Sequence, residues 1–197
     1  RTLVMRKIIF LIISSLIISC ENMNDNQPAK IVFLGDSITQ QAEDFEDGFI
    51  SLIRQNLVQD KFELVGKGIS GNKVSDLLTR YKSDVLDLNP DIVFIYIGIN
   101  DVWHKYDFGT GSDIDLYEKG LRTIISDIKS LGSEIVLCTP TVIGENTGDF
   151  VLGNQFKDVE TMEKMNGDLD TFSEVVRKLS NEYETELLDL RQIFMDY

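Results

Sequence analysis

Three short segments of the sequence carry residue types that together could hydrolyse an ester. Ser37 belongs to a Gly-Asp-Ser sequence, Gly71 to Gly-Ile-Ser-Gly-Asn, and Asn100 to Gly-Ile-Asn-Asp. A serine hydroxyl can attack a carbonyl carbon, and pre-aimed N–H groups stabilise the negative charge that forms on the carbonyl oxygen. Backbone N–H groups of Ser37 and Gly71 and the side-chain amide of Asn100 are suitable donors. These residues therefore predict a nucleophile with an oxyanion hole.

A serine hydrolase also needs a base for the hydroxyl, usually a histidine oriented by a carboxylate. The only histidine in the sequence is His104. On a helix it would lie one turn beyond Asn100, on the same face. Because Asn100 must point at the oxyanion, we expect His104 to contact substrate or line the pocket. A role for His104 as a substitute base is the alternative.

Taken singly, these segments have simpler interpretations. Gly-Asp-Ser after a strand is a common turn and helix-cap sequence, and Asn100-Asp101 could cap a helix that begins at Val102. Their order and common placement favour catalysis.

The elements that must position these residues are predicted by hydrophobic periodicity. Apolar runs alternate with helical patterns, which indicates parallel βαβ units and a three-layer α/β/α sandwich with a five-stranded parallel sheet. Each candidate segment directly follows an apolar run, and the carboxyl ends of parallel strands share one edge of the sheet. Strands are predicted at 30–34, 62–65, 91–97, 134–138 and 186–190, and helices at 45–59, 74–88, 116–131 (capped by Gly132) and 169–183; we predict a loop at 142–157, and Asp189 as a possible cap of a final helix.

The three candidate segments resemble the first three conserved blocks of the SGNH/GDSL hydrolases. The resemblance covers residues 30–197 and implies a flavodoxin-like fold and a serine ester hydrolase without cofactor or metal. It implies that Ser37 is the nucleophile and that the Ser37 and Gly71 amides and the Asn100 side chain form the oxyanion hole. Asp36 would order the nucleophile turn, and Asp101 would support the site. The expected substrate is a small ester or an acylated carbohydrate.

The last block of that family, an Asp-x-x-His pair after the fifth strand, has no counterpart before Tyr197. We therefore expect the domain at 30–197 to lack a C-terminal segment that supplies the base, and residues 1–197 alone to hydrolyse esters very slowly. The alternative function is a non-catalytic protein on the same scaffold that binds acyl glycans or lipids.

The N-terminal residues predict export. Residues 1–19 combine a basic start with a short apolar run, which is typical of a signal peptide and too short to span a bilayer. Ile17-Ile18-Ser19-Cys20 resembles a bacterial lipobox, so we expect a lipid on Cys20, a tether at 20–29, and a periplasmic or cell-surface lipoprotein. An ordinary signal peptide with an incidental cysteine is the alternative.

The net charge limits the possible binding partners, and the cysteine content limits the possible disulfides. The net charge of −14 argues against nucleic acid and against electrostatic binding to anionic lipid, so membrane contact is expected through the lipid anchor alone. Cys138 ends an apolar run and is predicted to be buried, with no disulfide.

Gly66-Lys67-Gly68-Ile69-Ser70-Gly71 also fits the glycine pattern of dinucleotide-binding proteins. That pattern requires an acidic residue at the end of the next strand, where this sequence has Gly-Ile-Asn. Nucleotide binding is therefore the weaker interpretation.

Overall fold

The computed structural model describes residues 27–57, 61–143, 151–152, 155–156 and 159–196. The predicted signal peptide at 1–19, the predicted lipidation site Cys20 and most of the tether predicted at 20–29 lie outside the described residues. Among the helices of the described part, none has the length and apolar character that a membrane crossing requires.

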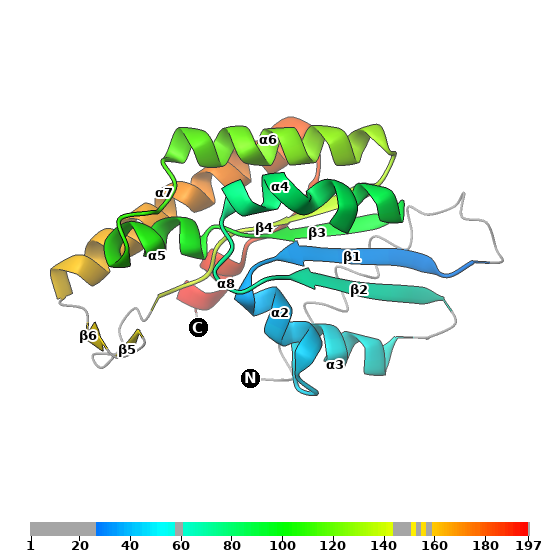
Figure 1. The fold of residues 1–197 in the computed structure, drawn as a ribbon, viewed down its shortest axis with the longest axis horizontal. Coiled ribbons are helices and arrows are strands. Elements are labelled where there is room, and N and C mark those ends of the chain that lie inside the picture. Colours follow the sequence, from blue (N-terminus) through cyan, green and yellow to red (C-terminus); the bar gives the residue numbers. More distant parts are fainter. Residues whose placement is uncertain (1–26, 58–60, 144–150, 153–154, 157–158, 197) are drawn as a thin grey trace.

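Five parallel strands form one sheet in the order β2-β1-β3-β4-β7 (Figure 1). The first strand of the chain lies between the second and third, which is the flavodoxin-like order of doubly wound sheets. The predicted five-stranded parallel sheet is therefore confirmed. The strands are β1 (Ala29–Gly35), β2 (Phe62–Gly68), β3 (Ile92–Tyr96), β4 (Glu134–Cys138) and β7 (Glu186–Leu188).

Helices cover both faces of this sheet and complete the three layers (Figure 1). Helices α4, α5, α6 and α7 pack on one face, and α2, α3 and α8 pack on the other. Their bounds are α2 (Ser37–Asp44), α3 (Phe49–Asn56), α4 (Val74–Asp84), α5 (Ile99–Asp107), α6 (Ile114–Ser130), α7 (Val159–Tyr183) and α8 (Leu190–Met195), with a 3₁₀ turn η1 (Leu86–Leu88).

Strand β3 shows how the sheet separates two hydrophobic cores. All of its residues are buried, as expected for a parallel strand covered on both faces. Val93 and Ile95 belong to the core under α4, α6 and α7, whereas Phe94 and Tyr96 belong to the core under α2 and α3. Cys138 is buried in the second core, which confirms its predicted burial.

Several predicted boundaries differ from the structure. The helix predicted at 45–59 begins only at Phe49, because the preceding helix α2 ends in extended backbone at Phe45. The helix predicted at 74–88 ends at Asp84 and continues as η1, which stops where Asn89 turns into the left-handed region. Gly132, with a φ of 84°, confirms the predicted end of α6.

The structure extends α7 towards the N-terminus by ten residues relative to the prediction of 169–183. Met165 and Leu169 are fully buried, so tertiary packing stabilises a turn whose sequence pattern is weak. Within the segment predicted as a loop at 142–157, two short strands pair antiparallel, β5 (Val151–Leu152) and β6 (Gln155–Phe156).

Candidate active site

The register of the sheet brings the carboxyl ends of its strands into one row. Gly35 pairs with Gly68 on one side and with Tyr96 on the other, and Tyr96 pairs with Cys138. Neighbouring strands lie about 4.8 Å apart, so residues that follow this row meet at one edge. The predicted convergence of the candidate segments is confirmed. Its centre lies between β1 and β3, where the strand order reverses and doubly wound sheets bind ligands.

Ser37 is the first residue of α2, and its turn is fixed by Asp36. The Asp36 carboxylate accepts a hydrogen bond of 3.0 Å from the Ile38 N–H, so it caps the helix. Asp36 is only 1% exposed. This burial, together with the nearby carboxylate of Asp101, raises the pKa of Asp36 to about 7. Ser37 thus follows a carboxyl group that titrates near neutral pH.

The loop that carries Gly71 is tied to the nucleophile turn by backbone groups. Ile69 donates its N–H to the Gly35 carbonyl at 3.3 Å, and Ser70 donates its N–H to Gln40 Oε1 in α2 at 2.8 Å. Gly71 has a φ of 76°, a conformation that residues with a Cβ rarely adopt. Because Gly71 has no side chain, a ligand can approach its backbone N–H closely.

Asn100 lies in the first turn of α5 and is buried. Its side-chain Nδ2 donates to the Asn72 carbonyl at 3.0 Å, which joins the β3 end to the Gly71 loop. A side-chain amide has two N–H donors, so one donor is left for a ligand. The alternative in which Asn100-Asp101 caps a helix at Val102 is wrong, because α5 already begins at Ile99.

Asp101 caps a different helix from the one that contains it. Its carboxylate oxygens accept hydrogen bonds of 3.1 and 3.2 Å from the Val74 N–H, at the N-terminus of α4. Burial raises the pKa of Asp101 to about 6, while hydrogen bonds from Ser112 and Val74 oppose this shift. Asp101 therefore holds α4, which follows the Gly71 loop, against α5, which carries Asn100.

His104 lies beside the Gly71 loop. A Cβ added to Gly71 would be 3.9 Å from His104 Cε1, and the Phe108 ring packs edge-on against the imidazole at 5.1 Å. Burial, helped by the nearby charge of Lys73, lowers the pKa of His104. Across the described part of the chain, no hydrogen bond joins His104 to Ser37. The imidazole thus forms a wall next to the predicted oxyanion hole.

The Ser37 hydroxyl makes no hydrogen bond to any residue that the structure describes. The described residues also contain no group of three or more His, Cys, Asp or Glu side chains placed to hold a metal ion. The arrangement at β1, β2 and β3 consequently offers a hydroxyl and several N–H donors for a substrate oxygen.

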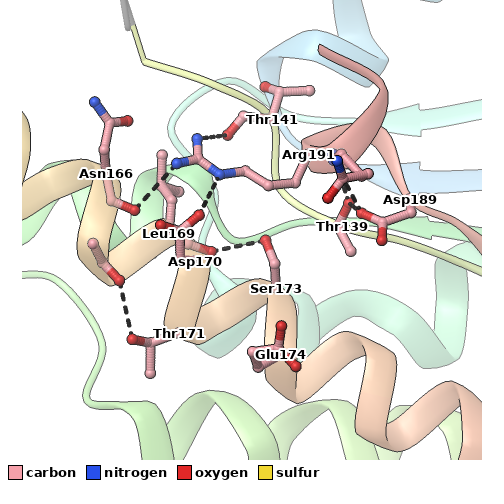
Figure 2. A network of polar contacts seen from close by, with 12 residues as sticks. Thr139, Thr141, Asn166, Leu169, Asp170, Thr171, Ser173, Glu174, Asp189 and Arg191 are labelled. Atoms are coloured by element: carbon pink, nitrogen blue, oxygen red, sulfur yellow. Dashed lines mark hydrogen bonds and ion pairs between the residues drawn. The ribbon is translucent and has the colours of Figure 1, made fainter. Parts of the chain in front are cut away.

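The other end of the same sheet edge is occupied by paired charges (Figure 2). Thr139 Oγ1 after β4 donates to Asp189 Oδ1 at 3.0 Å and accepts from the Arg191 N–H at 2.8 Å. The Arg191 guanidinium is directed into the molecule, where it pairs with Asp170 of α7 at 2.8 Å. Asp189 also caps α8 through the Gln192 N–H, as the sequence suggested.

The dinucleotide-type glycine pattern does not form a phosphate-binding turn. Gly66 and Gly68 lie inside β2 and pair with Phe33 and Gly35 of β1. A phosphate site of that type requires glycines in the turn between strand and helix. Only Gly71 of this pattern is in the turn.

Two residues that tie the segments together, Gln40 in α2 and Arg80 in α4, were not predicted from the sequence. Arg80 donates to the carbonyls of Gly35 and Lys67 and to the side chain of Asn72. Polar residues of an amphipathic helix normally face solvent, so their residue type gave no signal. Their position, on helices that directly follow candidate segments, could have drawn attention to them.

Known proteins resemble this chain in sequence and in fold. The model of the GDSL-like lipase/acylhydrolase family matches residues 33–197. The acetylxylan esterase of Geobacillus stearothermophilus is 31% identical over 183 residues, which are 84% of this chain and 77% of that protein.

Solved structures of acetylxylan esterases also resemble this chain in fold and sequence. The crystal structure of the acetyl xylan esterase AlAXEase is 38% identical with a TM-score of 0.73, and the match covers 85% of this chain and 80% of that one. A structure of Axe2, an acetylxylan esterase from Geobacillus stearothermophilus, is 29% identical with a TM-score of 0.71, over 88% of this chain and 81% of that one. Three Axe2 structures are of catalytic mutants in which a serine, an aspartate or a histidine is replaced by alanine.

Proposed function

The chain belongs to the GDSL-like lipase/acylhydrolase family of ester hydrolases, and from this premise we propose that it removes acetyl groups from acylated carbohydrates. The observation that carries this proposal is the convergence of Ser37, Gly71 and Asn100 at the point where the strand order reverses. The similarity to acetylxylan esterases supports the substrate class.

In this proposal Ser37 is the nucleophile. Its Oγ attacks the carbonyl carbon of the acetyl ester, and the carbonyl oxygen becomes an oxyanion. The N–H groups of Ser37 and Gly71 and the second N–H of Asn100 donate hydrogen bonds to that oxygen, and the position of Ser37 at the N-terminus of α2 favours the negative charge. A base takes the Ser37 proton during the attack and gives it to the sugar oxygen as the ester C–O bond breaks and the carbonyl re-forms. Water then hydrolyses the acetyl-enzyme to acetate and restores the Ser37 hydroxyl.

We propose that the base is a histidine of an Asp-x-x-His segment outside residues 1–197. The one histidine of the sequence, His104, lies against the Gly71 loop and has no hydrogen bond to Ser37 within the described residues. The catalytic aspartate and histidine that were mutated in Axe2 are consistent with such a pair. Without this base, the Ser37 hydroxyl is a weak nucleophile.

The remaining predicted residues have supporting roles in this proposal. Asp36 orders the turn that presents Ser37, and Asp101 holds α4 and α5 together beneath the donors. His104, whose pKa is lowered by burial, lies beside the Gly71 loop and contacts the substrate.

The test is hydrolysis of 4-nitrophenyl acetate and of acetylated xylan oligosaccharides by the full-length protein and its Ser37→Ala variant. We expect kcat to fall by at least about 10⁴-fold in Ser37→Ala, as for serine nucleophiles in general. The matched control is Ser126→Ala, which removes an exposed hydroxyl on α6. A Ser37→Ala variant with the activity of the control would refute the assignment of the nucleophile.

Export and lipid anchoring at Cys20 are proposals from the sequence. They predict that the protein incorporates labelled palmitate when it is produced in a bacterial host, and that Cys20→Ser abolishes labelling. Labelling of the Cys20→Ser variant would contradict the assignment of the anchor.

A further inference from the structure

Arg80 occupies the space behind the nucleophile turn and the Gly71 loop. Its side chain extends from α4 and is only 13% exposed. Nε donates to Asn72 Oδ1 at 2.8 Å, Nη1 donates to the Lys67 carbonyl at 3.1 Å, and Nη2 donates to the Gly35 carbonyl at 2.8 Å. Nη1 also pairs with Asp84, one turn further along α4. Four of the five N–H groups of the guanidinium are thus engaged.

These partners belong to the segments that carry the proposed donors. The Gly35 carbonyl immediately precedes Asp36 and Ser37, and it also accepts the Ile69 N–H of the Gly71 loop. Lys67 and Asn72 lie on either side of Gly71 in the sequence. The backbone carbonyl of Asn72 in turn accepts the hydrogen bond from Asn100. One guanidinium therefore connects the ends of β1 and β2 directly and the end of β3 through Asn72.

We propose that Arg80 is a positioning residue that aligns the three oxyanion donors. This inference rests on the proposed function and extends it to a residue that does not touch the substrate. Donors improve the rate only when they point at the oxygen of the transition state, and a displacement of about 1 Å can lower the rate by about 100-fold. Loss of Arg80 should therefore lower kcat and leave KM almost unchanged.

Arginine is required for this role because its donors form a rigid, planar fork. The fork reaches carbonyls of two strands and a side-chain amide at the same time. A lysine ammonium on a flexible stem can bind one or two of these acceptors, but it cannot fix their relative positions. The pairing with Asp84 supplies the counter-charge that a mostly buried cation needs.

The experiment measures kcat and KM for 4-nitrophenyl acetate in the full-length protein and in Arg80→Ala, Arg80→Lys and Asn72→Ala. We expect kcat to fall by about 100-fold in Arg80→Ala and about 10-fold in the other two, with KM within about threefold. The control is Arg122→Ala, which removes an arginine paired with Glu118 and Glu182 on the helical face. Its kcat should stay within about twofold of the parent value.

Hydrogen exchange of the backbone amides provides a readout independent of activity. The Ile69 and Ser70 N–H groups should exchange faster in Arg80→Ala, whereas Arg122→Ala should leave them unchanged. If Arg80→Ala does not fold, Arg80→Lys and Asn72→Ala test the proposal in its place. In these variants, too, kcat should fall while KM stays within about threefold.

Folded Arg80 variants with the kcat of the Arg122→Ala control would overturn the proposal, and so would a loss confined to KM. Failure of the proposed function is recognised separately, by activity that survives Ser37→Ala. In that case the exchange measurement still shows whether Arg80 holds the loop.

Discussion

The two halves of the sheet edge differ in their ion pairs. At the ends of β1, β2 and β3, polar side chains bind backbone groups of the neighbouring segments, as Asp36, Gln40 and Asn100 do. At the ends of β4 and β7, polar side chains also form ion pairs: Asp189 is paired with Arg177 at 2.7 Å, and Arg191 with Asp170 at 2.8 Å.

This difference separates a site from a structural network. In the first half, side chains hold loops in place through their backbone groups, and the proposed oxyanion donors of Ser37, Gly71 and Asn100 remain free of other described residues. In the second half, each charge already has an opposite charge (Figure 2). A ligand that binds there would have to break ion pairs, at a cost in free energy. Both halves lie at the carboxyl ends of the strands. The first half has the proposed N–H donors that bind no other described residue, and we therefore place the proposed site there.

After Ser37→Ala, the largest effect is expected from Asn100→Ala, which tests the first half. Removal of one oxyanion donor should lower kcat by about 10²–10³-fold, or about 3–4 kcal/mol, with a smaller change in KM. The measurement is steady-state hydrolysis of 4-nitrophenyl acetate by the full-length protein. Asn56→Ala, at the exposed end of α3, is the control. Equal kcat values for the two variants would remove Asn100 from the oxyanion hole.

A somewhat smaller effect, on stability alone, is expected from Arg191→Met in the second half. Loss of the guanidinium leaves the buried carbonyl of Thr141 and the partly buried carbonyl of Asn166 without this donor, which should cost about 2–3 kcal/mol of unfolding free energy in urea. Lys164→Met, which removes an exposed ion pair with Glu160, should cost less than about 1 kcal/mol. If the folded Arg191→Met protein lost most of its kcat, the division between the two halves would be wrong.

Asp36→Asn should change how stability depends on pH. Folding raises the pKa of Asp36 from 3.8 to about 7, so the native protein retains a proton that the unfolded chain releases. Stability from this proton is complete below about pH 4 and is lost as pH rises towards 7. The substituted asparagine keeps the cap without ionising, so the variant should gain on the order of 2 kcal/mol relative to the parent between pH 5 and pH 8.

Urea unfolding at the two pH values measures this gain. The neighbouring carboxylate of Asp101, which raises the pKa of Asp36, is present in both proteins. Asp47→Asn, at an exposed position before α3, is the control. A variant whose stability ran parallel to the parent across this range would show that Asp36 is ionised in the native state at pH 5.

The smallest effect is expected from His104→Gln. A residue that only lines the pocket should change KM for acetylated xylan oligosaccharides by less than about fivefold, or about 1 kcal/mol, and leave kcat within about twofold. A fall in kcat of about 10³-fold or more would instead identify His104 as the base and would place the complete catalytic machinery in the first half.

The sequence predicted those parts of the site that depend on strand ends. Apolar runs identified the strands, and the parallel order then placed Ser37, Gly71 and Asn100 on one edge, as the register confirms. The ties between these segments were not predicted, because the direction of a side chain such as Arg80 depends on helix packing. Asp101 was singled out, but its partner was not: it caps α4, which is remote in sequence.

Helix ends were predicted less well than strand ends for a related physical reason. The start of α7 is stabilised by contacts of Met165 and Leu169 with the core, and such contacts leave little trace in local periodicity. The break between α2 and α3 likewise depends on backbone conformation at Phe45. Strands buried on both faces, by contrast, are uninterrupted apolar runs that a sequence displays directly.

Gly98, before Asn100, has a consequence for how this site can evolve. Its φ of 132° disfavours any side chain, and an added Cβ would lie 2.8 Å from the Tyr117 hydroxyl. That hydroxyl is itself bonded to the Ile97 carbonyl at 2.9 Å. Shortening Tyr117 would open space but would not relieve the backbone, and no single mutation does both. We therefore expect every single substitution of Gly98 to cost folding stability, so the residue before Asn100 is fixed even where the residues around the site change.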